Sequence, residues 1–166
     1  MIQDIFFKSL VVGLVVAILA IIFDATTENL ILFSCLAASA AILVHHHEHS
    51  KTTLRVALEG YVIAGIIAIL ILYITTFFSL TYFPLKVFLA LTLSTFFMYL
   101  FNSFHPPAIA SAFAFIVFEQ SIFQLLIILL AVLFLLTLVK ISFYLRHPKL
   151  SFKDFYKELF TKHSNK

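Results

Sequence analysis

His105 is the residue of this chain whose position and chemistry point most clearly to a site. It stands in the stretch Asn102-Ser103-Phe104-His105-Pro106-Pro107, which interrupts a long apolar run. An imidazole can donate or accept hydrogen bonds and can carry a proton near neutral pH. We predict a substrate site at this break, with His105 as donor or proton carrier and with Asn102 and Ser111 as further hydrogen-bond donors.

The two prolines predict a change of helix at the same place. Pro106 and Pro107 lack the backbone N–H that continues a helix, but proline is well suited to the first positions of a new one. One helix should therefore stop near Phe104, and a short one should begin at Pro106 or Pro107. The start of a helix favours anions, through its N–H groups and its dipole. The alternative interpretation is a tight connection whose polar side chains only cap helix ends.

Arg55 and Glu59 are a second pair with chemical potential. They are four residues apart, a spacing at which helical side chains meet. Ionisable groups inside membrane segments are costly and indicate a pathway or a proton relay. We predict a coupling or gating role for both, and the alternative is an ion pair that reaches the membrane interface.

The loop His45-His46-His47-Glu48-His49 is a candidate metal site, because imidazole suits zinc, copper and nickel. Consecutive histidines rarely converge on one ion, so a solvated loop is the favoured interpretation and no metal or cofactor is predicted. The sequence has no serine–histidine–acid spacing, phosphate loop or zinc-protease motif, so no enzyme is predicted either.

The composition predicts an integral membrane protein. Of the 166 residues, 63% are hydrophobic and 11% charged, and the mean hydropathy is +1.11. A soluble domain carries about a quarter charged residues. Six of the eleven basic residues fall in the tail 146–166, which is too short and too close to the membrane to suggest a nucleic-acid partner. Its interleaved aromatic and basic residues predict an amphipathic helix on the membrane surface.

Six apolar segments follow from the pattern: 5–23, 30–44, 54–80, a fourth from after Lys86 to about 104, 107–118 and 122–145. The predicted fold is an all-helical, polytopic membrane bundle of four long and two short helices. If all six cross, the positive-inside rule places both termini in the cytoplasm. We expect a bacterial inner (plasma) membrane. The rival topology makes the second and fifth segments re-entrant.

An internal repeat accompanies this layout. Ala38-Ser39-Ala40 returns as Ala110-Ser111-Ala112, 72 positions later, in the short middle helix of each long–short–long triplet. Three crossings per unit would invert the second unit, as in many transporters. The predicted units are 1–80 and 81–145, followed by the tail 146–166. Ser39 thereby becomes a predicted substrate-binding residue, and stripes of small residues leave a homo-oligomer open.

His105-Pro106-Pro107-Ala108 followed by Ala110-Ser111-Ala112 resembles the signature of the HPP family of integral membrane proteins. Ala38-Ser39-Ala40 resembles that family's Gly-Ala-Ser-Ala stretch, and Arg55, Gly60 and Gly65 fall where its Arg-Asn-x-x-Gly-Gly-His and a later glycine would lie. The family's Gly-Gly-His is Glu59-Gly60-Tyr61 here. The resemblance covers residues 30–118 and implies four spans and, from relatives linked to nitrite transport, an anion-transport role.

Three functions remain open at this stage. The first is a small transporter or channel for a small solute, such as a monovalent anion, bound near the ends of the two short helices. The second is a structural or accessory membrane protein without a transport cycle. The third is a metal-responsive membrane protein that uses the His45–His49 loop. Membrane lipids are expected partners in each case.

Overall fold

The computed structural model describes residues 2–22, 30–45 and 54–146, and these residues form six α-helices and no strand. Their bounds are α1 (Ile2–Ile22), α2 (Leu30–His45), α3 (Leu54–Phe77), α4 (Phe83–Leu100), α5 (Pro106–Val117) and α6 (Ile122–Arg146). The all-helical prediction is confirmed for this part of the chain. The tail 147–166 and its predicted surface helix lie outside the described residues.

The helices differ in how far they could reach across a bilayer. Within the described residues, α3, α4 and α6 are long and apolar enough to cross a membrane. α1 has 21 residues, and its apolar part, Phe6–Ile22, is shorter than a candidate span. At 1.5 Å per residue, the 16 residues of α2 extend about 24 Å and the 12 of α5 about 18 Å. A hydrocarbon core is about 30 Å thick. The described residues thus contain three candidate spans, and α2 and α5 are shorter than the hydrocarbon core is thick.

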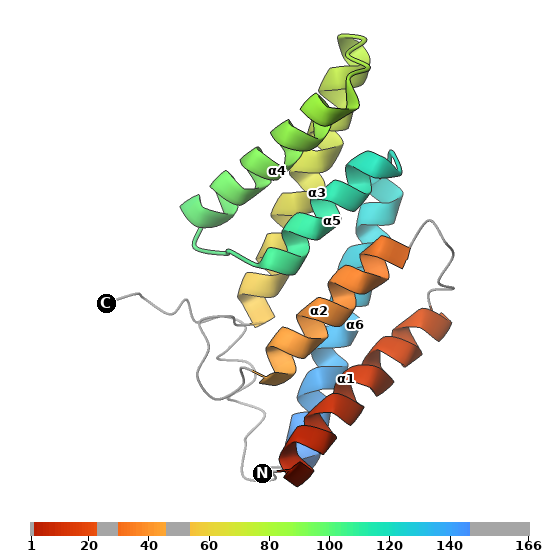
Figure 1. The fold of residues 1–166 in the computed structure, drawn as a ribbon, viewed down its shortest axis with the longest axis vertical. Coiled ribbons are helices and arrows are strands. Elements are labelled where there is room, and N and C mark those ends of the chain that lie inside the picture. The colour runs from red at the N-terminus through yellow and green to blue at the C-terminus, as the bar shows by residue number, and fades with distance from the viewer. Residues whose placement is uncertain (1, 23–29, 46–53, 147–166) are drawn as a thin grey trace.

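Successive helices run in alternating directions, and α5 lies among α2, α3 and α4 (Figure 1). The other contacting pairs are α1 with α2, α1 with α6, α2 with α6, α3 with α4, and α3 with α6. Burial follows this arrangement, because seven of the twelve residues of α5 are buried whereas α4 buries only Ala90, Ser94 and Met98. The short α5 is thus covered by protein, whereas most of α4 is exposed or only partly buried.

α4 ends four residues earlier than predicted, at Leu100. The Asn102 N–H donates to Tyr99 O and the Ser103 N–H to Met98 O, and Asn102 takes a φ of 55°. This pair of bonds around a left-handed residue is the Schellman helix end, for which asparagine is the second choice after glycine. The left-handed backbone of Asn102 therefore ends α4 several residues before Pro106 and Pro107.

Two further bounds differ from prediction for physical reasons. α4 begins at Phe83 rather than after Lys86, because Pro84 is tolerated in the first helical turn. α3 stops at Phe77 rather than at residue 80, because Ser79 takes a φ of 54° and Leu80 donates back to Thr75 O. The break at the prolines is confirmed, since α5 begins at Pro106 after an extended His105 (φ −135°, ψ 100°).

Candidate functional site

His105 lies at the centre of a buried polar cluster that joins three helices. Its side chain has no exposed surface, and its Nε2 lies 2.8 Å from the Ser39 Oγ of α2. The same Ser39 Oγ lies 2.9 Å from the Tyr61 hydroxyl of α3. The ring centroids of Tyr61 and His105 lie 5.8 Å apart, and the ring planes are tilted by 55°. We call Ser39, Tyr61 and His105 the central cluster.

The hydrogen count of the central cluster limits its bonding. Ser39 has one hydroxyl hydrogen but two bonded neighbours, so at least one bond must be donated by the Tyr61 hydroxyl or by a protonated Nε2 of His105. The opposite ring nitrogen, His105 Nδ1, is buried without a hydrogen-bond partner among the described residues. Because unpaired buried polar atoms are rare, this nitrogen has an unfilled capacity to bind a small polar molecule.

Gly60 allows α3 to approach the break closely enough to form the cluster. A Cβ at this position would lie 2.9 Å from His105 Cβ, 3.3 Å from Ser103 O and 3.4 Å from Ala108 Cβ. These neighbours are backbone or the stems of side chains, which cannot swing away. Glycine is therefore required here for close packing of two backbones, and its helical φ is ordinary.

The start of α5 does not supply the free N–H groups that the sequence suggested. Pro106 and Pro107 have none, and the Ala108 N–H donates to His105 O at 3.0 Å. The first three residues of α5 thus offer no unpaired N–H. A solute at this break would have to be bound by side chains, above all by His105. Pro107 is buried against the core, whereas Pro106 is exposed.

The other predicted donors are not brought to the central cluster. Asn102 is exposed and serves as the helix end described above. Ser111 is buried, but its hydroxyl donates to Ala108 O of its own helix at 2.7 Å. Of the predicted substrate residues, the structure therefore brings together Ser39 and His105. Tyr61 was not predicted as a site residue. It occupies the position of the histidine in the family's Gly-Gly-His motif, and this could have indicated a role in the site.

Arg55 and Glu59 line an open groove beside the cluster, not the cluster itself. The Arg55 Nε donates to Glu59 Oε1, and about a third of each side chain is exposed. The groove has a volume of about 320 Å³. Its walls are Leu58, Val62 and Ile63 of α3 together with Phe101 and Ser103 beyond α4.

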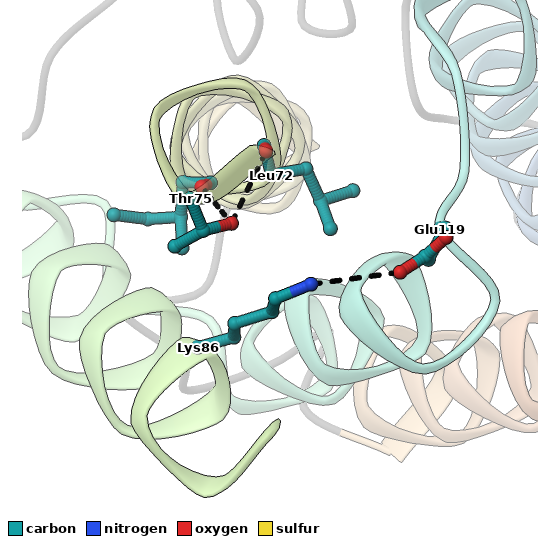
Figure 2. A network of polar contacts seen from close by, with 5 residues as sticks. Leu72, Thr75, Lys86 and Glu119 are labelled. Carbon is teal, nitrogen blue, oxygen red and sulfur yellow. Dashed lines mark hydrogen bonds and ion pairs between the residues drawn. The ribbon is translucent and has the colours of Figure 1, made fainter. Parts of the chain in front are cut away.

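The opposite end of the bundle carries a different ion pair (Figure 2). Lys86, near the start of α4, extends its Nζ to 3.6 Å from Oε1 of Glu119, which follows α5. Thr75 of α3 lies nearby, and its hydroxyl donates to Ile71 O and Leu72 O of its own helix. The pair ties the beginning of α4 to the end of α5.

The histidine loop is outside the structural description. The side chains of residues 45–49 are not described, so their geometry adds nothing to the metal hypothesis. Within the described helices and turns, no three histidine, cysteine or carboxylate side chains gather as metal ligands would. Cys35 is buried in α2 and free.

The comparison with protein families identifies the class of protein that this fold and site define. Residues 1–147 match the family described as HPP, transmembrane region. The match covers most of the chain, so the protein belongs to the HPP family of integral membrane proteins, as the His-Pro-Pro motif predicted. No curated protein and no solved structure matches it.

Proposed function

We propose that this HPP-family protein is a small transporter or channel for a small solute, with a monovalent anion such as nitrite as the first candidate. The observation that carries the proposal is His105, which is fully buried at the break between α4 and α5 and keeps Nδ1 unpaired. A buried break in a membrane helix persists where it is covered by protein or lines a cavity, and polar groups at such places mark solute pathways.

The chemistry of the central cluster suits a small hydrogen-bonding solute. Ser39 and Tyr61 provide hydroxyls and His105 an imidazole, and none of the three is a carboxylate that would repel an anion. The cluster also joins α2, α3 and the start of α5, so a solute that displaced one of its bonds would loosen contacts among three helices. We propose this exchange of bonds as the solute-binding step.

A six-span topology with both termini in the cytoplasm belongs to the proposal. In the re-entrant alternative, Lys86 and Glu119 would lie on opposite sides of the membrane, because one crossing and one re-entrant loop would separate them. Their side chains are 3.6 Å apart, which favours six crossings. The alternating helix directions in Figure 1 agree with that topology.

The pattern of helix contacts supports the proposed inverted repeat. Exchanging α1 with α4, α2 with α5 and α3 with α6 turns each helix pair named above into a pair that also makes contact, and α2 with α5 and α3 with α6 map onto themselves. For example, α1 with α2 becomes α4 with α5, and α3 with α5 becomes α6 with α2. Such exchange symmetry is expected of transporters built from inverted repeats, whose substrate site lies between the units. The bond from Ser39 to His105 crosses between the two units.

Counterflow of nitrite, nitrate, chloride and formate in proteoliposomes tests the proposal. We expect the wild type to exchange at least one of these anions and His105→Ala to lose most of that flux. Thr75→Val is the matched control, because it removes a buried hydroxyl that bonds only within its own helix. Absence of exchange by the wild type for every anion would refute anion transport.

The complete burial of the central cluster also favours a second function, a structural or accessory membrane protein. In that case the Ser39–His105 bond only locks α2 to the break. Ser39→Ala would then lower thermal stability, and neither the wild type nor the variant would transport a solute. A transporter would instead show altered flux in Ser39→Ala under conditions where the variant remains folded.

A further inference from the structure

The groove beside Arg55 is chemically distinct from the central cluster. Among the described residues that line it, Arg55 is the one cation and Glu59 the one anion, and the others are uncharged, so these residues together carry no net charge. A simple anion bound at Arg55 would also meet the Glu59 carboxylate, and a simple cation bound at Glu59 would meet the guanidinium. The groove is therefore matched to a ligand that carries both charges.

Ser103 gives independent evidence for a ligand in the groove. Its side chain is fully buried, it lines the groove, and its Oγ has no hydrogen-bond partner in the part of the chain that the structure describes. A buried hydroxyl without a partner costs free energy unless something bonds to it. The missing partner would be a polar group of a ligand in the groove, toward which the Ser103 side chain would have to turn.

The apolar side of α3 continues from the groove toward the other end of the helix. Leu58 and Val62 lie in the groove, and the next residues on the same helical ridge are exposed and apolar: Ile66 (53%), Leu70 (47%) and Ile74 (38%). Residues four apart form one row on a helix surface. Arg55 is the second residue of the 24-residue α3, and the end of a spanning helix reaches the headgroup layer. A polar head with an apolar chain would fit this row.

We propose that the groove binds one zwitterionic phospholipid whose head bears a primary ammonium, such as phosphatidylethanolamine. The phosphate would bond to Arg55 and the Ser103 hydroxyl, and the ammonium would bond to Glu59. The two-carbon bridge of ethanolamine keeps its ammonium close to the phosphate, as the paired Arg55 and Glu59 side chains require. An acyl chain would follow the ridge formed by Leu58, Val62, Ile66, Leu70 and Ile74. This site is separate from the proposed solute site and does not depend on transport.

Native mass spectrometry of the detergent-purified protein tests the site directly. The protein is mixed with equal amounts of phosphatidylethanolamine, phosphatidylcholine and phosphatidylglycerol, and the retained adducts are compared. We expect one bound phosphatidylethanolamine, retained about tenfold above phosphatidylglycerol. Phosphatidylcholine should be intermediate, because its trimethylammonium cannot donate an N–H to Glu59. Equal retention of the ethanolamine and glycerol lipids by the wild type would overturn the proposal and needs no variant.

Glu59→Gln provides the sharper test because it leaves the groove with a net positive charge. We expect this variant to reverse the preference, so that phosphatidylglycerol is retained above phosphatidylethanolamine. Arg55→Gln should weaken retention of both. The matched control is Lys86→Gln, which breaks the ion pair at the opposite end and should keep the wild-type preference. An unchanged preference in Glu59→Gln would contradict the proposal.

Soluble head groups separate a lipid from a free zwitterion. Short-chain phosphatidylethanolamine should displace the bound lipid at a concentration at least tenfold below that of phosphoethanolamine. If both compete at the same concentration, the groove recognises the head group alone and the lipid assignment fails. These measurements record binding, so a protein that transports no anion can still pass them, and a transporting protein can still fail them.

Discussion

At the scale of residues, the site depends on one close approach and one shared hydroxyl. Gly60 lets α3 lie against the break, and Ser39 connects His105 with Tyr61. Gly60 has no room for a side chain, and the single Ser39 hydroxyl serves two partners. A substitution at either position should therefore change stability more than the same substitution at a control position.

The first prediction concerns Gly60. Gly60→Ala would place a methyl group 2.9 Å from His105 Cβ, so we expect a loss of about 1–3 kcal/mol in the free energy of unfolding. Gly13→Ala is the control, because a Cβ there meets nothing within 4 Å and alanine favours a helix by about 0.5–1 kcal/mol. Circular dichroism during unfolding in mixed micelles measures both. Equal effects of the two substitutions would show that α3 does not pack closely on the break.

The second prediction concerns Tyr61. Tyr61→Phe removes one of the two bonds to Ser39, and we expect a loss of about 1 kcal/mol in the free energy of unfolding together with altered solute flux. Thr75→Val should cost less, because the carbonyls that its hydroxyl meets already belong to helix backbone. The same unfolding assay compares the two variants. A Tyr61→Phe protein as stable as the wild type and with unaltered flux would exclude the Tyr61 hydroxyl from the site.

At the scale of elements, three helices end at a non-glycine residue with a left-handed backbone. Ser79, Asn102 and Glu119 follow α3, α4 and α5, and all three take a positive φ although none is glycine. In each case the next residue donates back to a carbonyl five positions earlier. Left-handed backbone costs an ordinary L-residue about 1–2 kcal/mol, so these ends are held by the packing of the helices they terminate.

The third prediction separates a capping role from a solute-binding role for Asn102. Asn102→Ala should lower the free energy of unfolding by about 1 kcal/mol, whereas Asn102→Gly should preserve or raise it. If Asn102 only ends α4, the glycine variant also keeps wild-type counterflow. Loss of flux in Asn102→Gly at unchanged stability would restore the predicted donor role. Thermal unfolding and counterflow on the same preparations provide the comparison.

At the scale of the whole molecule, the bundle depends on a short helix being surrounded by longer ones. α5 is about 18 Å long and lies among α2, α3 and α4. Its starting residues contact α2 and α3, and the residue after it, Glu119, reaches Lys86 at the start of α4. These contacts at the two ends of one helix support the proposed six-crossing topology.

The fourth prediction tests that topology. In a Cys35→Ala background, we introduce single cysteines by Ser79→Cys, Asn102→Cys and Glu119→Cys, at positions that are all exposed. A membrane-impermeant maleimide applied from outside the cell should label positions 79 and 119 but not 102. The re-entrant topology gives a different result, with 102 and 119 labelled and 79 protected. Labelling of 79 and 119 from opposite sides would contradict six crossings.

Much of the fold could be predicted from the sequence because membrane helices are strongly constrained. The apolar runs located all six helices, and Pro106 and Pro107 located the break. The end of α4 was missed because the competing signal was a single asparagine, whose left-handed backbone stops the helix before the prolines. Serine and glutamate at the other two ends carry even less signal, since neither favours positive φ.

The candidate site was predicted only in part. His105 and Ser39 were both expected at the substrate site, but their 2.8 Å contact depends on how α2 packs against the break, which no local pattern encodes. Tyr61 was not expected as a site residue, because aromatic residues are common on apolar helices. Ser111 has the sequence context of Ser39, yet it bonds within its own helix, so a repeated motif did not imply a repeated role.

The unequal lengths of the spanning helices have a consequence for where the protein is most stable. The candidate span of α4, Phe83–Leu100, has 18 residues and extends about 27 Å, whereas that of α3, Arg55–Phe77, has 23 residues and extends about 35 Å. A thin bilayer suits α4 and obliges α3 to tilt, while a thick bilayer leaves α4 short. Each ångström of hydrophobic mismatch costs a fraction of a kcal/mol. Stability measured across phospholipids of increasing acyl length should therefore peak at the shorter chains, and the protein should partition away from thick, ordered membrane regions.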